Sequence, residues 1–337
     1  MIECIFTVDY EIYGNGEGSL RDLVYEPAER LNEIFHKWSA PFVVFTEVAE
    51  LQMIEATRTD PAIDLVKRQL RDFHRSGVEL GLHLHPQWCN ARHVAGRWVL
   101  DYSEYNLCLL PQRRIIEIVD RAIGYLRDVL AIADFTPLSF RAGNWLFQPT
   151  QAAAEVLAQR GIKIDSSVYK GGMRHQYHLD YRGALRNGYY WKFTDKVDVP
   201  VGDGVLLELP IYTQMVPFWK LLTGKRFALE QRAHSLAQPH TAKLYRGLDL
   251  LRFHHPMKLD FCRMALEELI AAVNQIIHED AQDPDSFRPI VAIGHTKELT
   301  DLMTVDSFLS YLTRHGIPVS TLADTYHRCL QNLSVSA

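Results

Sequence analysis

Apolar residues along the chain fall into two alternating patterns. Short and almost continuously apolar runs, such as "CIFTV" (4–8) and "PIVAIG" (289–294), are typical of strands buried on both faces of a parallel sheet. Longer segments with apolar residues three and four positions apart are typical of helices that cover such a sheet. The pattern predicts strands over 3–11, 41–50, 78–86, 137–145, 162–168, 289–296 and 318–322, and helices over 26–38, 61–77, 111–131, 149–160, 262–279 and 305–316.

The alternation is interrupted between residues 170 and 260. This segment is rich in aromatic residues and histidine, and within it we predict one strand (204–211) and some helix around 228–251. A shorter excursion, 93–105, is predicted to form a hairpin. No linker, repeat or low-complexity tract divides the chain. We therefore expect one α/β domain over 1–337, in which residues 170–260 form a large insertion that lies on the substrate side.

Composition narrows the class of protein further. The 337 residues are 47% hydrophobic and 23% charged with a net charge of −5, which is ordinary for a globular protein and gives no reason to expect nucleic acid as a partner. No apolar run is long enough to suggest a membrane span. The five scattered cysteines favour neither a disulfide framework nor a thiolate metal site. Because the N-terminus lacks a signal-peptide pattern, we expect a cytoplasmic protein.

Ionisable residues follow four of the predicted strands. Asp9 and Glu11 end the first strand, and "VELGL" leads into His83 and His85. "PLSF" leads into Arg141 and "PIVAIG" into His295. The carboxyl ends of parallel strands converge on one face of an α/β fold, where sites are built. Each residue alone could be a polar strand end bonded to a loop, but four such endings predict a site.

Residues two apart on a strand point to the same side, so Asp9 with Glu11, and His83 with His85, form two same-face pairs. Two carboxylates this close are costly unless a cation or a proton separates them. Two imidazoles and a carboxylate are reasonable ligands for a divalent cation. The sequence therefore predicts a metal ion that neutralises one carboxylate and leaves the other charged.

These motifs, in this order, resemble those of a known family. "TVDYE", "ELGLHLHP", "FRAG", "KIDSS" and "IGH" look like the polysaccharide deacetylases of the NodB-homology, carbohydrate esterase family 4 type. "HLHPQW" and "FRAGNW" resemble the branch associated with bacterial surface-glycan biosynthesis. The resemblance covers 3–168 and about 289–322 and implies a distorted (β/α) barrel.

The resemblance also implies roles for individual residues. Asp9 matches the general base and Arg141 the arginine that holds it. His295 matches the general acid, and Asp165 resembles the aspartate that orients that histidine. Glu11 stands where variant members keep the metal-binding acid, and His83 matches the first metal histidine. The family's second metal histidine lies four residues further on, where this chain has Gln87, so His85 is the expected substitute and Gln87 the alternative.

The reaction implied is hydrolysis of an acetamide on an acetylated amino sugar, with one divalent ion, which we expect to be zinc. Without a secretion signal, the expected substrate is a glycan precursor. The alternatives are hydrolysis of a non-sugar cyclic amide or ureide on the same fold, and an inactive carbohydrate-binding barrel. Four aromatic residues are candidates for stacking on sugar rings, although large aromatics more often pack in cores. They are Trp88, Trp145, Tyr190 and Trp191.

Overall fold

The computed structural model describes residues 1–226, 229 and 252–335. Its main sheet has eight strands in the order β10-β11-β7-β6-β3-β2-β1-β14, and all neighbours are parallel except the pair β10 and β11. The strands are β1 (Ile2–Tyr10), β2 (Val43–Glu47), β3 (Glu79–Leu84), β6 (Ser139–Ala142), β7 (Ile164–Asp165), β10 (Trp191–Phe193), β11 (Leu206–Glu208) and β14 (Arg288–His295).

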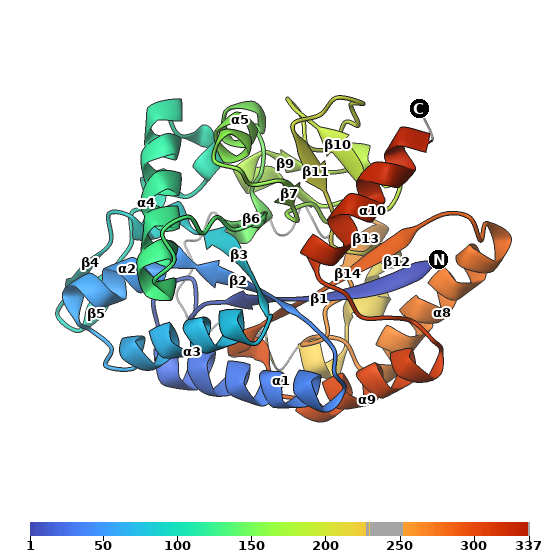
Figure 1. The fold of residues 1–337 in the computed structure, drawn as a ribbon, viewed down its shortest axis with the longest axis horizontal. Helices are drawn as coiled ribbons and strands as arrows, with labels where there is room; N and C mark the ends of the chain where they lie inside the picture. Colours follow the sequence, from blue (N-terminus) through green and yellow to red (C-terminus); the bar gives the residue numbers. More distant parts are fainter. Residues whose placement is uncertain (227–228, 230–251, 336–337) are drawn as a thin grey trace.

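Helices lie around the outside of this curved sheet (Figure 1). Their inward faces are apolar, as in α1, where Ala28, Leu31 and Phe35 are buried at helical spacing. None of the described helices is both long enough and apolar enough to cross a membrane. The helices are α1 (Glu26–Lys37), α2 (Val48–Thr57), α3 (Ile63–Arg75), α4 (Gln112–Leu130), α5 (Gln151–Gln159), α8 (Leu266–Gln282), α9 (Leu302–Arg314) and α10 (Leu322–Val335).

The sheet curls into a distorted barrel that is closed by short bridges. Ile211, just beyond β11, bridges to Val291 of β14, and the Tyr212 amide donates to the carbonyl of Val291 at 2.9 Å. Further along β14, Asp260 bridges to Ile293. The strands that close the barrel are thus reduced to single residues, which confirms the fold class predicted from the sequence.

Three small antiparallel pairs lie outside the main sheet. The hairpin predicted over 93–105 is confirmed as β4 (Arg92–Val94) and β5 (Arg97–Val99). In the 170–260 segment, β10 and β11 extend the main sheet, and the strand predicted over 204–211 is confirmed as β11. The helix predicted around 228–251 lies outside the described residues. The other pairs are β8 (Met173–Arg174) with β9 (Leu179–Asp180), and β12 (Thr213–Pro217) with β13 (His254–Lys258).

Two predicted strands are wrong in part. The segment 41–50 is a strand only to Glu47, whose carboxylate accepts the backbone N–H groups of Ala49 and Glu50 and so begins α2. The segment 318–322 forms a single bridge, Cys4 to Val319, before α10 begins at Leu322. An apolar run alone does not distinguish a buried strand from the first turn of a buried helix.

Candidate active site

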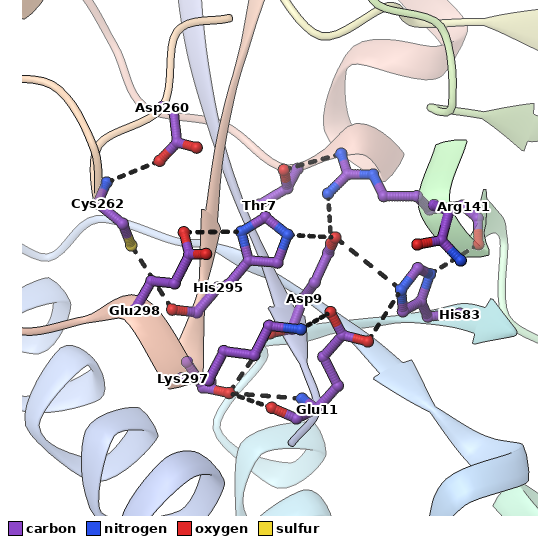
Figure 2. A network of polar contacts seen from close by, with 12 residues as sticks. Thr7, Asp9, Glu11, His83, Arg141, Asp260, Cys262, His295, Lys297 and Glu298 are labelled. Atoms are coloured by element: carbon purple, nitrogen blue, oxygen red, sulfur yellow. Dashed lines mark hydrogen bonds and ion pairs between the residues drawn. The ribbon is translucent and has the colours of Figure 1, made fainter. Parts of the chain in front are cut away.

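Asp9, at the end of β1, is buried and held by Arg141 of β6. The Arg141 Nη1 donates to Asp9 Oδ1 at 2.6 Å, and its Nη2 donates to the Thr7 hydroxyl at 2.9 Å (Figure 2). Burial would raise the pKa of Asp9, but the Arg141 guanidinium and the His83 imidazole outweigh it, so the pKa lies below its ordinary value. Asp9 is therefore a carboxylate at neutral pH.

Glu11 follows β1 and is paired with a different cation. Lys297 Nζ donates to Glu11 Oε1 at 2.7 Å (Figure 2). Burial is again outweighed, here by Lys297 and His85, and the pKa of Glu11 lies well below its usual range. Each of the two neighbouring carboxylates thus has its own protein cation, Arg141 or Lys297, so both can stay ionised.

The other oxygen of Glu11 faces the two imidazoles predicted as metal ligands. Glu11 Oε2 lies 3.1 Å from His85 Nε2 and 3.6 Å from His83 Nε2. Both histidines are buried. Burial lowers the pKa of His83, but Asp9 and Glu11 outweigh it and raise this pKa to about 9. His83 is therefore protonated at neutral pH in the metal-free protein, and a metal ion must displace that proton.

A fourth residue, Glu47, joins these three and was missed in the sequence. It ends β2 and is the lateral partner of His83 on β3. Its Oε1 accepts the N–H groups that begin α2, whereas its buried Oε2 has no hydrogen-bond partner. Burial raises the pKa of Glu47 to about 7 despite the nearby imidazoles of His85 and His83.

The outer nitrogens of both imidazoles are also engaged. His83 Nδ1 lies 2.8 Å from the Arg141 carbonyl, so it carries the hydrogen and leaves Nε2 for a ligand. His85 Nδ1 contacts the side-chain amides of Gln87 at 3.1 Å and Asn144 at 3.2 Å. Gln87 therefore lies behind His85 and orients it, while His85 Nε2 faces Glu11. The geometry favours His85 over Gln87 as the ligand.

This donor set fits a divalent cation. The ligand atoms of Glu11, Glu47, His83 and His85 all lie within 4.8 Å of one another. Metal bonds of about 2.0–2.2 Å place tetrahedral ligand atoms roughly 3.4 Å apart, close to the 3.1 and 3.6 Å between Glu11 and the imidazoles. The unpartnered Glu47 Oε2 is the observation that most directly indicates a missing partner.

His295 ends β14 on the other side of Asp9. Its Nε2 lies 3.4 Å from Asp9 Oδ2, and its Nδ1 lies 3.7 Å from Glu298 Oε2 (Figure 2). Arg263 donates to both oxygens of Glu298. Burial raises the pKa of Glu298, but Arg263 outweighs it and the pKa falls to about 2. Burial lowers the pKa of His295 itself.

The role predicted for Asp165 is wrong in its geometry. Among the described residues, the carboxylates within ion-pair distance of His295 are those of Asp9 and Glu298. Asp165 instead accepts from the hydroxyl and amide of Ser167 and shares a hydrogen bond with Glu208. Burial raises the pKa of Asp165 to about 6 and that of Glu208 well above its usual value, so this pair holds a proton.

Three of the four predicted stacking residues lie away from the site or within the core. Trp88 is buried edge-on against Trp98, and Trp191 is buried with its N–H on the Val197 carbonyl, so neither presents a ring face to a ligand. Tyr190 packs on Phe287, which precedes β14, whereas His295 ends that strand. Only Trp145 lies at the site: its ring meets His295 edge-on at 5.9 Å.

The residues that sequence reasoning missed carry weak signals. Glu298 and Lys297 follow His295 directly in "GHTKE", and Glu47 ends the run "FVVFTE". Each has the strand-end position that identified Asp9 and His295, so extending that rule would have found them. The pair His254 and His255 lies on β13, outside the metal-type clusters of the described residues.

No family model and no curated protein sequence matches the chain. Solved structures do match it. A Mycobacterium smegmatis protein described as a polysaccharide deacetylase superposes with a TM-score of 0.54 at 14% identity, over 99% of this chain and 91% of that one. The chain therefore has the distorted barrel fold of the polysaccharide deacetylases, and the family resemblance seen in its motifs is confirmed at the level of the fold.

Two further structures cover most of the chain at lower scores. A Pseudomonas aeruginosa PAO1 protein, also described as a polysaccharide deacetylase, has a TM-score of 0.48 at 13% identity, over 96% of this chain and 89% of that one. An allantoinase has a TM-score of 0.48 at 15% identity, over 96% of this chain and 88% of that one.

Proposed function

We propose that this chain is a metal-dependent hydrolase that removes an acetyl group from an N-acetylated sugar of a glycan precursor. One observation carries the proposal. A buried carboxylate held by an arginine, an imidazole, and a cluster of two carboxylates and two imidazoles come together at the carboxyl ends of the strands. These are the groups that amide hydrolysis by an activated water requires.

Glu11, Glu47, His83 and His85 would hold the ion, for which zinc suits the nitrogen and carboxylate donors. When bound, such an ion lowers the pKa of a coordinated water and polarises the acyl oxygen. Lys297 occupies Glu11 Oε1 and leaves Oε2 toward the imidazoles, so the lysine fixes the carboxylate in its binding orientation.

Asp9 would act as the general base. Arg141 keeps it ionised and occupies Oδ1, which leaves Oδ2 to accept a proton from the attacking water. Arg141 is itself fully buried, and its guanidinium N–H groups donate hydrogen bonds to Asp9, Thr7 and Ser166. The base is thus held rigidly, as general base catalysis requires.

His295 would deliver the proton to the departing amine. The protonated imidazole is the active form, and its Nε2 lies 3.4 Å from Asp9 Oδ2, so the acid and the base face the same reacting group. Glu298 stabilises the imidazolium from the Nδ1 side, as an acidic partner does in a catalytic triad. The lowered pKa of His295 makes the protonated imidazole a stronger acid, which readily gives its proton to the amine.

The substitution Asp9→Asn tests the proposal. We expect kcat for acetate release from N-acetylated sugar oligomers to fall by about 10²–10⁴-fold, because the base is lost while the metal ligands remain. Zinc content, measured by elemental analysis, should be unchanged in the variant. Full turnover by Asp9→Asn would contradict the assignment of the base.

Assays with different substrates distinguish the proposed deacetylase from the two alternative functions. Acetate release by the zinc-loaded wild type supports the proposal. Hydrolysis of a cyclic ureide without acetate release would replace it with the ureide-cleaving alternative. Binding of sugar oligomers with no turnover of either substrate would identify an inactive carbohydrate-binding barrel.

A further inference from the structure

Trp145 lies beside the candidate active site in a strained loop. It follows β6, and both Asn144 and Trp145 have positive φ angles, 55° and 60°. Non-glycine residues rarely adopt this conformation, and such strain is concentrated at functional sites. The indole ring meets His295 edge-on at 5.9 Å, so a group bound against Trp145 lies next to the reaction centre.

Two cations are placed on this ring. Lys258, the last residue of β13, has its Nζ 3.0 Å from the Trp145 ring centroid and 5.1 Å from that of Tyr169. Arg174 of β8 has its Cζ 5.4 Å from the Trp145 centroid. Aromatic faces attract both cations, but they neutralise neither charge.

Among the described residues, neither Lys258 nor Arg174 has a carboxylate within ion-pair distance; the Tyr169 hydroxyl contacts Arg174. The Trp145 indole N–H is buried and has no acceptor. These three neighbouring groups are all donors without an anionic partner, and leaving buried donors unmatched is costly.

The nearest acids are already paired with another cation. The two carboxylate oxygens of Glu298 accept hydrogen bonds from Nε and Nη2 of Arg263, and Asp260 Oδ2 lies 3.8 Å from Arg263 Nε. Asp260 Oδ1 accepts the backbone amides of Cys262 and Arg263. Burial lowers the pKa of Lys258 well below its usual value, although Asp260 opposes the shift, so the lysine lacks a counter-ion close enough to compensate.

A cleft opens on the solvent side of Lys258. Its volume is about 460 Å³, and its lining includes Pro256, Met257, Lys258, Asp260 and Arg263. Lys258 lines this cleft and also lies over the Trp145 ring, which meets His295, so the lysine links the cleft to the candidate active site.

We infer that Lys258, Arg174 and the Trp145 N–H bind an anionic oxygen group, a phosphate or a carboxylate, carried by the substrate next to its acetamide. This inference rests on the proposed function and specifies its substrate class as an acidic or phosphorylated sugar. An oxyanion accepts several hydrogen bonds at once and would match all three donors. Arg174 and Lys258 then determine specificity and take no part in bond cleavage.

Binding of three non-acetylated probes to the full-length chain tests the inference by calorimetry at low salt. The probes are glucose 1-phosphate, glucuronate and glucose, which share a ring and differ in charge. We expect at least one anionic probe to bind about tenfold or more tightly than glucose. Tighter binding of the phosphate indicates a phosphorylated substrate, and tighter binding of glucuronate indicates an acidic sugar.

Lys258→Met should reduce the affinity for the anionic probe to that for glucose, and Lys258→Arg should restore part of it. Lys37→Met is the matched control, because Lys37 also lies over a tryptophan (5.3 Å from the Trp38 centroid) but is paired with Asp306. Should Lys258→Met fail to fold, Arg174→Met makes the same test.

The inference is overturned if neither anionic probe binds more tightly than glucose, or if Lys258→Met and Lys37→Met bind the anions equally well. Because the probes carry no acetyl group, this result is independent of acetate release. Anion binding without turnover would leave the inference standing and overturn the proposed function.

Discussion

Asp9 and Glu11 are two residues apart, and each is stabilised as an anion by its own basic residue. Arg141 pairs with Asp9 at 2.6 Å and Lys297 with Glu11 at 2.7 Å. The two carboxylates consequently need not share a proton as close carboxyl pairs do, which allows the distinct roles proposed for them, one as base and one as ligand. The nearby pair Asp165 and Glu208 has no such cations within ion-pair distance among the described residues, and it does hold a proton.

The substitution Glu298→Gln tests whether Glu298 is the acidic partner of His295. Removing the Glu298 charge lowers the pKa of His295 further, because that charge raises it. The protonated imidazole is then present only at lower pH, so the alkaline limb of the kcat–pH profile should move to lower pH, with a loss in kcat of roughly tenfold or more.

Glu298→Asp should restore part of the profile, since it keeps the charge on the Nδ1 side. Asp165→Asn should leave the position of the alkaline limb unchanged, because Asp165 bonds to Ser167 and Glu208. A shift caused by Asp165→Asn alone would restore the role predicted from the sequence.

At the scale of elements, the boundary between β2 and α2 shapes the metal-type cluster. Glu47 ends the strand and begins the helix through Oε1, its Oε2 has no hydrogen-bond partner, and the residue pairs laterally with His83 on the neighbouring strand. One carboxylate thus links local structure to the site. The unpartnered oxygen leaves Glu47 available as a metal ligand, which the apolar pattern of the strand does not reveal.

Glu47→Gln should lower zinc affinity by about tenfold or more, since one anionic ligand is lost. Competition with a chromogenic chelator measures this affinity without any turnover. Glu50→Gln is the control, because Glu50 is also buried but accepts the Ile12 amide, and a glutamine oxygen can do the same. Equal zinc affinity in both variants would remove Glu47 from the ligand set.

At the scale of the whole molecule, closure of the barrel positions His295. The chain at 211–212 and at 259–261 bonds along β14, where the Phe261 amide donates to the Ile293 carbonyl at 3.0 Å. Gly294 allows this approach, because a Cβ there would lie 2.3 Å from the Phe261 ring. Phe261 is itself buried against Phe6, so the ring has little room to move.

Gly294→Ala should therefore lower the free energy of unfolding by about 1–3 kcal/mol through overpacking, measured by urea denaturation. Gly124→Ala is the control: Gly124 lies in α4 with open space around its Cβ position, and alanine there should stabilise the helix by about 0.5–1 kcal/mol. Equal stability of the Gly294→Ala variant and the wild type would show that the closing segment is not tightly packed.

Local patterns in the chain predict most of the buried strands and covering helices, although not α2 or α10, and they identify the strand ends that carry Asp9, His83, Arg141 and His295. These follow from local periodicity, which a one-dimensional pattern records. The residue type at a strand end also indicates the chemistry, so the metal-type site was predictable.

Which carboxylates contact which imidazoles depends on how distant strands are arranged in the folded protein. Lateral register brought Glu47 to His83 and Glu208 to Asp165, and the turn after β14 brought Glu298 to His295. The donors around Trp145 come from three segments far apart in the chain. Such side-chain contacts depend on the register between strands and on the twist and closure of the sheet, which no local sequence pattern encodes.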